Sequence, residues 1–334
     1  MEIQSASFRE KVLALSYQAW SARALQIAVR LKIFEVVEAS DGTAEKIARI
    51  SRLEPRAAEL FLNALAGVGL IEKRGRRFRN SAAGREIFLP RGGKYLGDIV
   101  GLSDRGWGLW GNLEKALRTG KALDTPDFFK TRSEAVGAFI RAMDNTAKGH
   151  ADLLARSLSL KGRRRLLDIG GGSGAFSLAF LKQNSRLQVT LFDLPQTLRM
   201  TREFVKKSPF RNRIRYQAGD LERDGFQGRF DAIFVSHILH GLSEKQNLEL
   251  LKKIYRALEP KGLVILQDFF LSADKTSPPF AAVFALNMLI HTAQGRTYSQ
   301  VEVKDWLRQT GFRKIQSPRL SLPRNISILC AERI

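Results

Sequence analysis

Apolar residues near the start of the chain recur at a helical period. Between Phe8 and Val37 they return every three to four positions, which predicts one amphipathic helix with more apolar area than a surface helix needs. The stripe consists of Leu13, Tyr17, Trp20, Ala24, Ile27 and Leu31. Two shorter helices are predicted next. One opens at the N-cap Thr43, and the other has Pro55 in its first turn and ends before Gly69.

A basic ribbon follows these helices. Residues 71–80 are predicted to form two strands that turn at Gly75, and helices followed by such a ribbon are typical of winged-helix DNA-binding domains. The helix that would enter a DNA groove is mostly apolar, however, with Glu59 and Asn63 as its main polar groups. A major-groove helix needs polar and basic side chains on its exposed face. We therefore interpret residues 1–95 as a winged-helix-like dimerisation domain and do not expect nucleic acid as a partner.

Residues 97–161 are predicted to be helical, with a break at Asp124–Asp127. This stretch is rich in large apolar side chains: Trp107, Trp110, Phe128, Phe129, Phe139 and Met143. Each of them fits an ordinary core, and as a group they also fit the roof of a pocket for a flat substrate. We assign residues 96–160 as a helical linker that contributes to an acceptor pocket.

From residue 161 onwards, short apolar runs alternate with helical patterns. The predicted strands are one that ends at Ile169, then Gln188–Asp193, Ile214–Ala218, Phe230–Ser236, Leu263–Gln267, Phe312–Ser317 and Ile326–Ala331. Helices are predicted after the first strand and at 198–207 and 245–258. This alternation predicts an α/β domain with a doubly wound, Rossmann-like sheet of seven mostly parallel strands. The short connection at 318–324 predicts a C-terminal antiparallel hairpin.

Composition excludes several classes of protein. The chain has 334 residues, 44% of them hydrophobic, and no apolar run approaches the roughly 20 residues that span a bilayer. Residues 1–9 contain no secretory apolar segment, so we expect a cytoplasmic protein. The single cysteine, Cys330, excludes an internal disulfide and a cysteine-cluster metal site.

The formal net charge of +22 would favour a polyanionic partner such as nucleic acid or an anionic membrane surface. The excess is spread almost evenly, with +6 in the first 100 residues and +16 in the other 234. A solvated basic surface explains an even excess as well as a binding patch does. Peripheral association with a membrane is compatible with this charge, but nothing in the sequence indicates it.

Leu166–Gly174 reads as a strand, a glycine loop and the start of a helix, a junction that holds a polar ligand against exposed backbone N–H groups. Its spacing also satisfies the dinucleotide fingerprint, so the glycines alone do not identify the ligand. Asp168, Asp193 and Asp220 end or follow three successive strands. Three carboxylates around one pocket would repel a pyrophosphate but suit a cationic ligand that carries a ribose.

These residues resemble the nucleotide loop of class I S-adenosylmethionine-dependent methyltransferases. The resemblance implies S-adenosylmethionine as cofactor, S-adenosylhomocysteine as product and no metal. It also implies that Asp193 holds the ribose hydroxyls, Asp220 and Leu221 the adenine edge, and Gly170 and Gly172 the methionine moiety. The full set of expected cofactor-binding residues is Asp168, Gly170, Gly172, Asp193, Leu194, Asp220, Leu221 and Ser236.

Ligands of such sheets bind beyond the carboxyl ends of the strands, where the fourth and fifth predicted strands bring His240 and Asp268. A histidine can accept a proton near neutral pH, and a carboxylate can fix its tautomer, so these two residues are the candidate base and its orienting acid. His237 is a competing base, although a capping or core role suits it better. A metal site on His237 and His240 is not expected, because no third ligand with suitable spacing is evident.

Nearly the whole chain resembles the caffeic acid and hydroxyindole type of small-molecule O-methyltransferases. Leu239–Ser243 matches the segment that carries the family's catalytic histidine, and Asp268 matches a first flanking acid. Two features depart from the family pattern. Gly295 stands where a second acid is expected, and Gly241-Leu242 replaces an Asp-Trp pair.

The same resemblance implies a homodimer formed through the N-terminal domain and a small, flat acceptor. It places Phe139 and Met143, Met288 and His291 around that acceptor, and we add Trp107 from the aromatic stretch at 97–161. The predicted reaction is methyl transfer to a hydroxyl, with His240 as general base. Two alternatives stay open: N-, S- or C-methylation of a small molecule or quinol precursor, and a non-catalytic dimeric ligand-binding or regulatory protein on the same fold.

Overall fold

A computed structural model describes residues 7–123, 133–318, 320 and 326–334. The chain divides into two compact units, residues 1–107 and 108–334. The expected break at Asp124–Asp127, the side chains of Phe128 and Phe129, and most of the turn at 318–324 lie outside the described residues.

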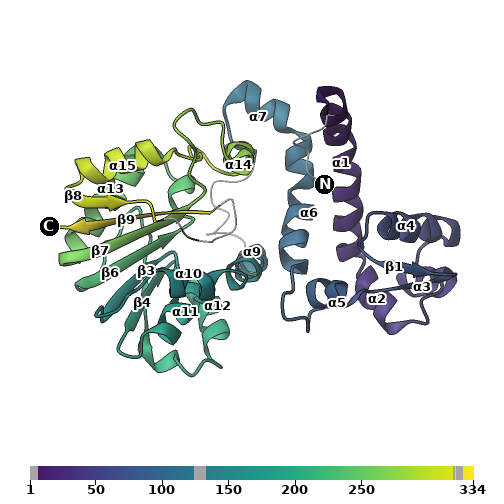
Figure 1. Ribbon diagram of the computed structural model, residues 1–334, viewed down its shortest axis with the longest axis horizontal. Helices are drawn as coiled ribbons and strands as arrows, with labels where there is room; N and C mark the ends of the chain where they lie inside the picture. The colour runs from purple at the N-terminus through teal and green to yellow at the C-terminus, as the bar shows by residue number, and fades with distance from the viewer. Residues whose placement is uncertain (1–6, 124–132, 319, 321–325) are drawn as a thin grey trace. The chain divides into compact units, whose positions relative to one another are not determined.

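The first unit is helical, with one small ribbon (Figure 1). Its elements are α1 (Phe8–Arg30), α2 (Ile33–Ala39), α3 (Ala44–Ser51), α4 (Pro55–Gly67), β1 (Glu72–Arg74), β2 (Arg77–Arg79), α5 (Ala82–Phe88) and α6 (Gly97–Gly111), in which the division at residue 107 falls. The predicted N-cap is confirmed, because the Thr43 side chain accepts a hydrogen bond from the Lys46 N–H. The ribbon turns at Gly75, where φ is +56°, as predicted.

The single helix predicted over 8–37 is wrong. The helix ends at Arg30, and Lys32 takes the left-handed conformation with φ +54° before α2 begins. This turn lets Phe34 and Val37 of α2 join Leu62 and Leu65 of α4 in the core of the unit. Burial of these side chains outweighs continuation of one helical period.

The second unit holds the predicted seven-stranded sheet. Its strands are β3 (Arg165–Ile169), β4 (Gln188–Asp193), β5 (Ile214–Ala218), β6 (Phe230–Ser236), β7 (Leu258–Asp268), β8 (Phe312–Gln316) and β9 (Ser327–Arg333), in the order β5-β4-β3-β6-β7-β9-β8. All strands run parallel except β9, which is antiparallel to both of its neighbours. The doubly wound sheet with a C-terminal hairpin is therefore confirmed. Strand β7 starts at Leu258, five residues before the predicted start.

The helices of this unit are α7 (Leu113–Thr119), α9 (Ser133–Lys148), α10 (Ala151–Ser157), α11 (Ala175–Gln183), α12 (Pro195–Val205), α13 (Glu244–Ala257), α14 (Pro279–His291) and α15 (Gln300–Gln309). The sequence interpretation missed α14 and α15. Helix α14 is apolar almost throughout, so no amphipathic period marks it. A capping box of Ser299 and Glu302 starts α15, and that signal was available in the sequence.

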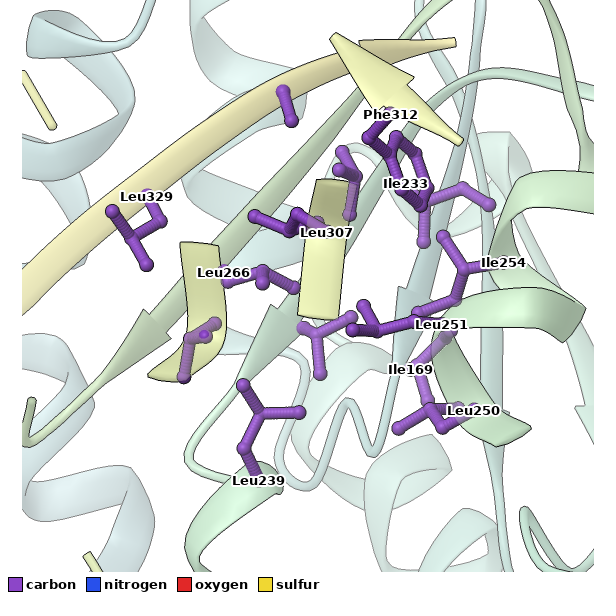
Figure 2. Packing of buried hydrophobic residues seen from close by; sticks show 14 of the residues in the cluster. Ile169, Ile233, Leu239, Leu250, Leu251, Ile254, Leu266, Leu307, Phe312 and Leu329 are labelled. Atoms are coloured by element: carbon purple, nitrogen blue, oxygen red, sulfur yellow. The ribbon is translucent and has the colours of Figure 1, made fainter. Parts of the chain in front are cut away.

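Helices cover both faces of the sheet. On one face α13 and α15 pack against side chains of β3, β6, β7 and β9, among them Ile169, Ile233, Leu266 and Leu329 (Figure 2). On the other face α10, α11 and α12 pack against the alternate residues of the same strands, such as Leu166 and Phe234. The parallel strands all end at one edge of the sheet, and that edge is where a ligand site forms. Among the described residues, no helix is both long and apolar enough to cross a membrane.

Candidate active site

The glycine loop leaves β3 at Ile169 and enters α11. Its backbone has φ values of +68° at Gly170 and +54° at Gly172, a region that glycine occupies without strain. At Gly171 a Cβ atom would lie 2.0 Å from the Leu191 side chain. The loop is fixed by the Gly170 N–H, which donates to the Phe192 carbonyl at 2.8 Å, and by the Thr201 hydroxyl, which donates to the Gly172 carbonyl at 2.6 Å. This rigid loop can present its main chain to a ligand.

Asp168 is buried beneath the loop. Its carboxylate accepts a hydrogen bond of 2.6 Å from the Ser177 hydroxyl, at the start of α11. Burial raises the pKa of Asp168 to about 7, against the lowering effect of the Ser177 hydrogen bond and with a further rise from the charge of Asp193. The pair of acids therefore creates a negative environment that a cationic ligand would relieve.

Asp193, the last residue of β4, ties its strand to the glycine loop. One carboxylate oxygen accepts the Gly172 N–H at 3.0 Å, and the other accepts the Leu194 N–H at 2.8 Å. Burial raises the pKa of Asp193, although both hydrogen bonds oppose the rise. The carboxylate thus lies directly beside Gly172, and the family resemblance predicts the ribose and the methionine moiety at these two residues.

The remaining expected cofactor residues follow β5 and β6. Asp220 accepts the Glu222 N–H at 3.0 Å, while the half-buried Leu221 packs against the core. The hydroxyl of Ser236 accepts a hydrogen bond of 3.0 Å from the Gln267 amide. Because β3, β4, β5 and β6 are parallel neighbours, their ends bring these residues to one edge of the sheet.

His240 and Asp268 form a direct pair. His240 lies on a short 3₁₀ turn (Leu239–Gly241) after β6, and Asp268 ends β7. The imidazole Nδ1 is 2.6 Å from the Asp268 Oδ1, and Asp268 also accepts the Phe269 N–H at 2.8 Å. An ionised carboxylate only accepts hydrogen bonds, so the Nδ1 of His240 carries a proton and its Nε2 is left for another partner.

Two histidines keep this carboxylate ionised. Burial by itself raises the pKa of Asp268, but the charge and hydrogen bond of His240, together with the nearby His237, lower the pKa well below its ordinary range. Only 3% of the Asp268 side chain and 14% of the His240 side chain are exposed. A buried anion of this kind can stabilise an imidazolium.

Phenylalanine rings surround His240. Phe284 of α14 meets the imidazole edge-on with ring centroids 5.1 Å apart, and Phe269 lies nearly parallel to it at 6.0 Å. Phe280 contacts Phe269 in turn, at 5.1 Å. The sequence interpretation did not single out these rings, because two of them lie on the missed helix α14. They give the pair an apolar, aromatic setting.

Close packing at Gly295 leaves no room for the second acid that was expected beside the histidine. A Cβ atom at this position would lie 2.5 Å from the His240 carbonyl oxygen and 2.5 Å from the Thr292 hydroxyl. No side chain fits there without a shift of the backbone. Next to His240, by contrast, a Cβ at Gly241 would meet no atom within 4 Å.

The expected acceptor residues lie on two helices. Phe139 and Met143 are half-buried on α9, while α14 carries Met288, which is buried, and His291, which is half-buried. Trp107 belongs to the first unit, where the Arg23 guanidinium lies 5.1 Å from the centroid of its ring. The role of these five residues as an acceptor lining stays a prediction.

The sequence interpretation did not identify a polar cluster of Gln267, His237 and His150, which lies next to Asp268. The Gln267 amide nitrogen lies 3.1 Å from the Nε2 of His237 and 3.5 Å from the Nε2 of His150. His150 and Gln267 are 117 positions apart, so no local pattern joins them. Asp268 is a third potential ligand that the spacing along the chain did not reveal, because its carboxylate lies within 4.8 Å of the ring nitrogens of His237 and His240. Hydrogen bonds from His240 and from the Phe269 N–H account for the position of Asp268.

Comparison with known proteins identifies related sequences across the chain. Residues 121–313 match the model of the O-methyltransferase domain, and residues 13–89 match that of the O-methyltransferase dimerisation domain.

A 3-hydroxy-5-methyl-1-naphthoate 3-O-methyltransferase from Streptomyces sahachiroi is 31% identical over 310 residues, or 91% of this chain and 89% of the relative. The tetracenomycin polyketide synthesis 8-O-methyl transferase TcmO from Streptomyces glaucescens is 30% identical over 324 residues and 95% of each chain. Among solved structures, that of PigF with S-adenosylhomocysteine superposes with a TM-score of 0.89 at 25% identity, over 98% of this chain and 100% of the other. A PigF from a Serratia strain is also a sequence relative.

Proposed function

The chain belongs to the O-methyltransferase family and is an S-adenosylmethionine-dependent enzyme, and from this premise we propose that it methylates a hydroxyl group of a small aromatic acceptor with His240 as general base. The observation that carries the proposal is the 2.6 Å contact between the His240 Nδ1 and the Asp268 carboxylate. That contact holds the ring in one tautomer and leaves its Nε2 lone pair free to accept a proton.

His240 and Asp268 have different roles in the proposed reaction. The Nε2 of His240 takes the proton of the acceptor hydroxyl while the oxygen attacks, and Asp268 stabilises the imidazolium that forms. The proton then leaves to solvent. S-adenosylmethionine, when bound, supplies a methyl group activated as a sulfonium and departs as S-adenosylhomocysteine.

The glycine loop and the strand ends fit this cofactor. Gly170 and Gly172 offer main chain without a Cβ, and the pKa values of Asp168 and Asp193, both raised by burial, favour a cationic ligand beside them. We assign Asp193 to the ribose, with Leu194 beside it, and Asp220 with Leu221 to the adenine. Ser236 completes the proposed site.

An aromatic acceptor suits the rings of Phe269 and Phe284 around His240. We assign the acceptor lining within the second unit to Phe139, Met143, Met288 and His291. A fused-ring phenol is the acceptor class that we favour, since the two bacterial relatives described above are an O-methyltransferase of a hydroxynaphthoate and one of tetracenomycin synthesis.

The test is methyl transfer from S-adenosylmethionine to a panel of naphthols and hydroxynaphthoates, with aryl thiols and arylamines of the same ring systems as comparison. We expect turnover on the phenols and a loss of about 10²-fold or more in kcat for His240→Gln, because proton transfer loses its base. Binding of S-adenosylhomocysteine, measured by calorimetry, should be unchanged in that variant. An unchanged kcat would contradict the base, and turnover of the thiols or amines alone would contradict the acceptor class.

We also propose that the enzyme is a homodimer formed through residues 1–95, with a linker at 96–160 and the catalytic domain at 161–334. The family's dimerisation domain is present, and α1 exposes large apolar side chains, including 81% of Phe8 and 71% of Trp20. A second copy would cover this stripe. Nucleic acid is not a favoured partner, since the exposed side chains of α4 include Leu60 and Val68 is exposed at its end.

A further inference from the structure

His237 occupies a position that the proposed mechanism does not use. It follows β6 directly and adopts the left-handed conformation, with φ +55°. Residues other than glycine rarely adopt this conformation. In this conformation the imidazole lies between Gln267 and Asp268. Its Nδ1 is buried without a hydrogen-bond partner among the described residues.

The neighbours of the ring determine which nitrogen carries its proton. The His237 Nε2 lies 3.1 Å from the Gln267 amide nitrogen, which can only donate, so Nε2 accepts and the proton sits on Nδ1. Rotating the amide by 180° would bring its oxygen, which is buried without a hydrogen-bond partner among the described residues, to Nε2. Nε2 could then donate to the amide oxygen, but an unprotonated Nδ1 would face the Asp268 anion, 3.7 Å away.

Asp268 therefore faces an N–H group on each of two imidazoles. The Nδ1 of His240 lies 2.6 Å from Oδ1, and the Nδ1 of His237 lies 3.7 Å from the same oxygen. Phe269 packs against His237 with ring centroids 4.5 Å apart and closes this side. On the side of Gly295 no side chain fits beside the His240 backbone, so a second carboxylate cannot support the base from there.

We propose that His237 is a positioning residue for the methyl transfer: its Nδ1–H, oriented by Gln267, holds the Asp268 carboxylate against His240 in place of a second acid. The proposal rests on the proposed function, in which His240 is the base. At 3.7 Å the contact between His237 and Asp268 is longer than a hydrogen bond, and we expect it to shorten when the acceptor binds.

The first test is independent of catalysis. The chain has four histidines, so ¹⁵N-histidine spectra of the full-length enzyme can be assigned by substituting each in turn. We expect His237 to show a protonated Nδ1 and an unprotonated Nε2. Asp268→Asn should shift the signals of both His237 and His240, whereas Asp274→Asn, a change at an exposed loop aspartate, should shift neither. A His237 protonated on Nε2 alone would overturn the proposal even if the enzyme is a methyltransferase.

The second test measures turnover with a pair of variants. The amide nitrogen of an asparagine is as far along the side chain as Nδ1, so His237→Asn keeps a donor, while His237→Phe keeps the ring and loses the donor. We expect kcat to fall about 10-fold in His237→Phe and to stay within about 2-fold of wild type in His237→Asn. Equal losses in the two variants would overturn the positioning role. A loss in His237→Phe as large as that in His240→Gln would instead make His237 the base.

Discussion

At the scale of single residues, the buried acids of this protein have opposite electrostatic roles. Asp168 lies under the glycine loop with a hydroxyl as its hydrogen-bond partner, and burial raises its pKa to about 7. Asp268 is equally buried, but two histidines lower its pKa. The same residue type thus favours a cationic ligand at one strand end and is held as an ionised acceptor beside His240 at another.

The raised pKa of Asp168 makes stability depend on pH. Between about pH 4 and about pH 7 the folded protein holds a proton that the unfolded chain has lost, so the free energy of unfolding falls as the pH rises through this range. In Asp168→Asn this contribution disappears. From pH 5.5 to pH 8 we expect the wild type to lose about 2 kcal/mol more stability than the variant, in urea unfolding without cofactor.

Asp152→Asn is the matched control, because Asp152 lies on the surface in an ion pair of 3.1 Å with Lys182. We expect its pH dependence to follow that of the wild type. An equal change of the free energy of unfolding with pH in all three proteins would mean that Asp168 is already ionised in the folded state at pH 5.5.

At the scale of elements, the connections after the strands determine the geometry of the site. The 3₁₀ turn with His240 follows β6, and the segment around Gly295 connects α14 to α15. The two segments touch so closely that a Cβ at residue 295 would lie 2.5 Å from the His240 carbonyl oxygen. Close packing between these two connections therefore helps to fix the backbone of His240, in addition to the hydrogen bond between its side chain and Asp268.

Substitution of Gly295 tests this contact. We expect Gly295→Ala to lower the free energy of unfolding by about 1–3 kcal/mol, since the backbone at His240 must move to admit the methyl group. Turnover should fall as well, because His240 shifts relative to Asp268. Gly241→Ala is the control for stability: its Cβ would meet no atom within 4 Å, and we expect a change within about 0.5 kcal/mol in the same urea titration. Similar losses in both variants would contradict the steric explanation.

At the scale of the whole molecule, an exposed apolar stripe on α1 calls for a partner surface. Leu13 and Tyr17 are 39% and 51% exposed, and Trp20 is 71% exposed. Large aromatic side chains carry much of the binding energy of protein interfaces. This surface lies within the stretch that matches the family's dimerisation domain.

We expect Trp20→Ser to weaken the dimer by at least about 10-fold in sedimentation equilibrium, because it removes the largest exposed ring of the stripe. Lys11→Ser is the control. Residues 11 and 20 are nine positions apart and therefore lie on opposite faces of an α-helix, so this change should leave the dimer intact. A wild-type protein that is monomeric at micromolar concentration would contradict the dimer itself.

The sequence by itself determined the sheet and the position of its ligand edge. Strands β4, β5 and β6 have the predicted bounds, and β6 is the clearest case, because a strand buried on both faces must be almost continuously apolar. Since parallel strands end at one edge, the predicted acids and His240 had to meet there. Local chemistry also marked the glycine loop, whose left-handed residues Gly170 and Gly172 require glycine.

Only the tertiary structure decided how that edge is arranged. The left-handed Lys32 breaks the predicted first helix so that Phe34 can be buried, and the place beside His240 is closed at Gly295. The orientation of His237 depends on Gln267, 30 positions away, which also contacts His150. These features depend on contacts between segments that are far apart in the sequence. Local sequence patterns do not reveal such contacts.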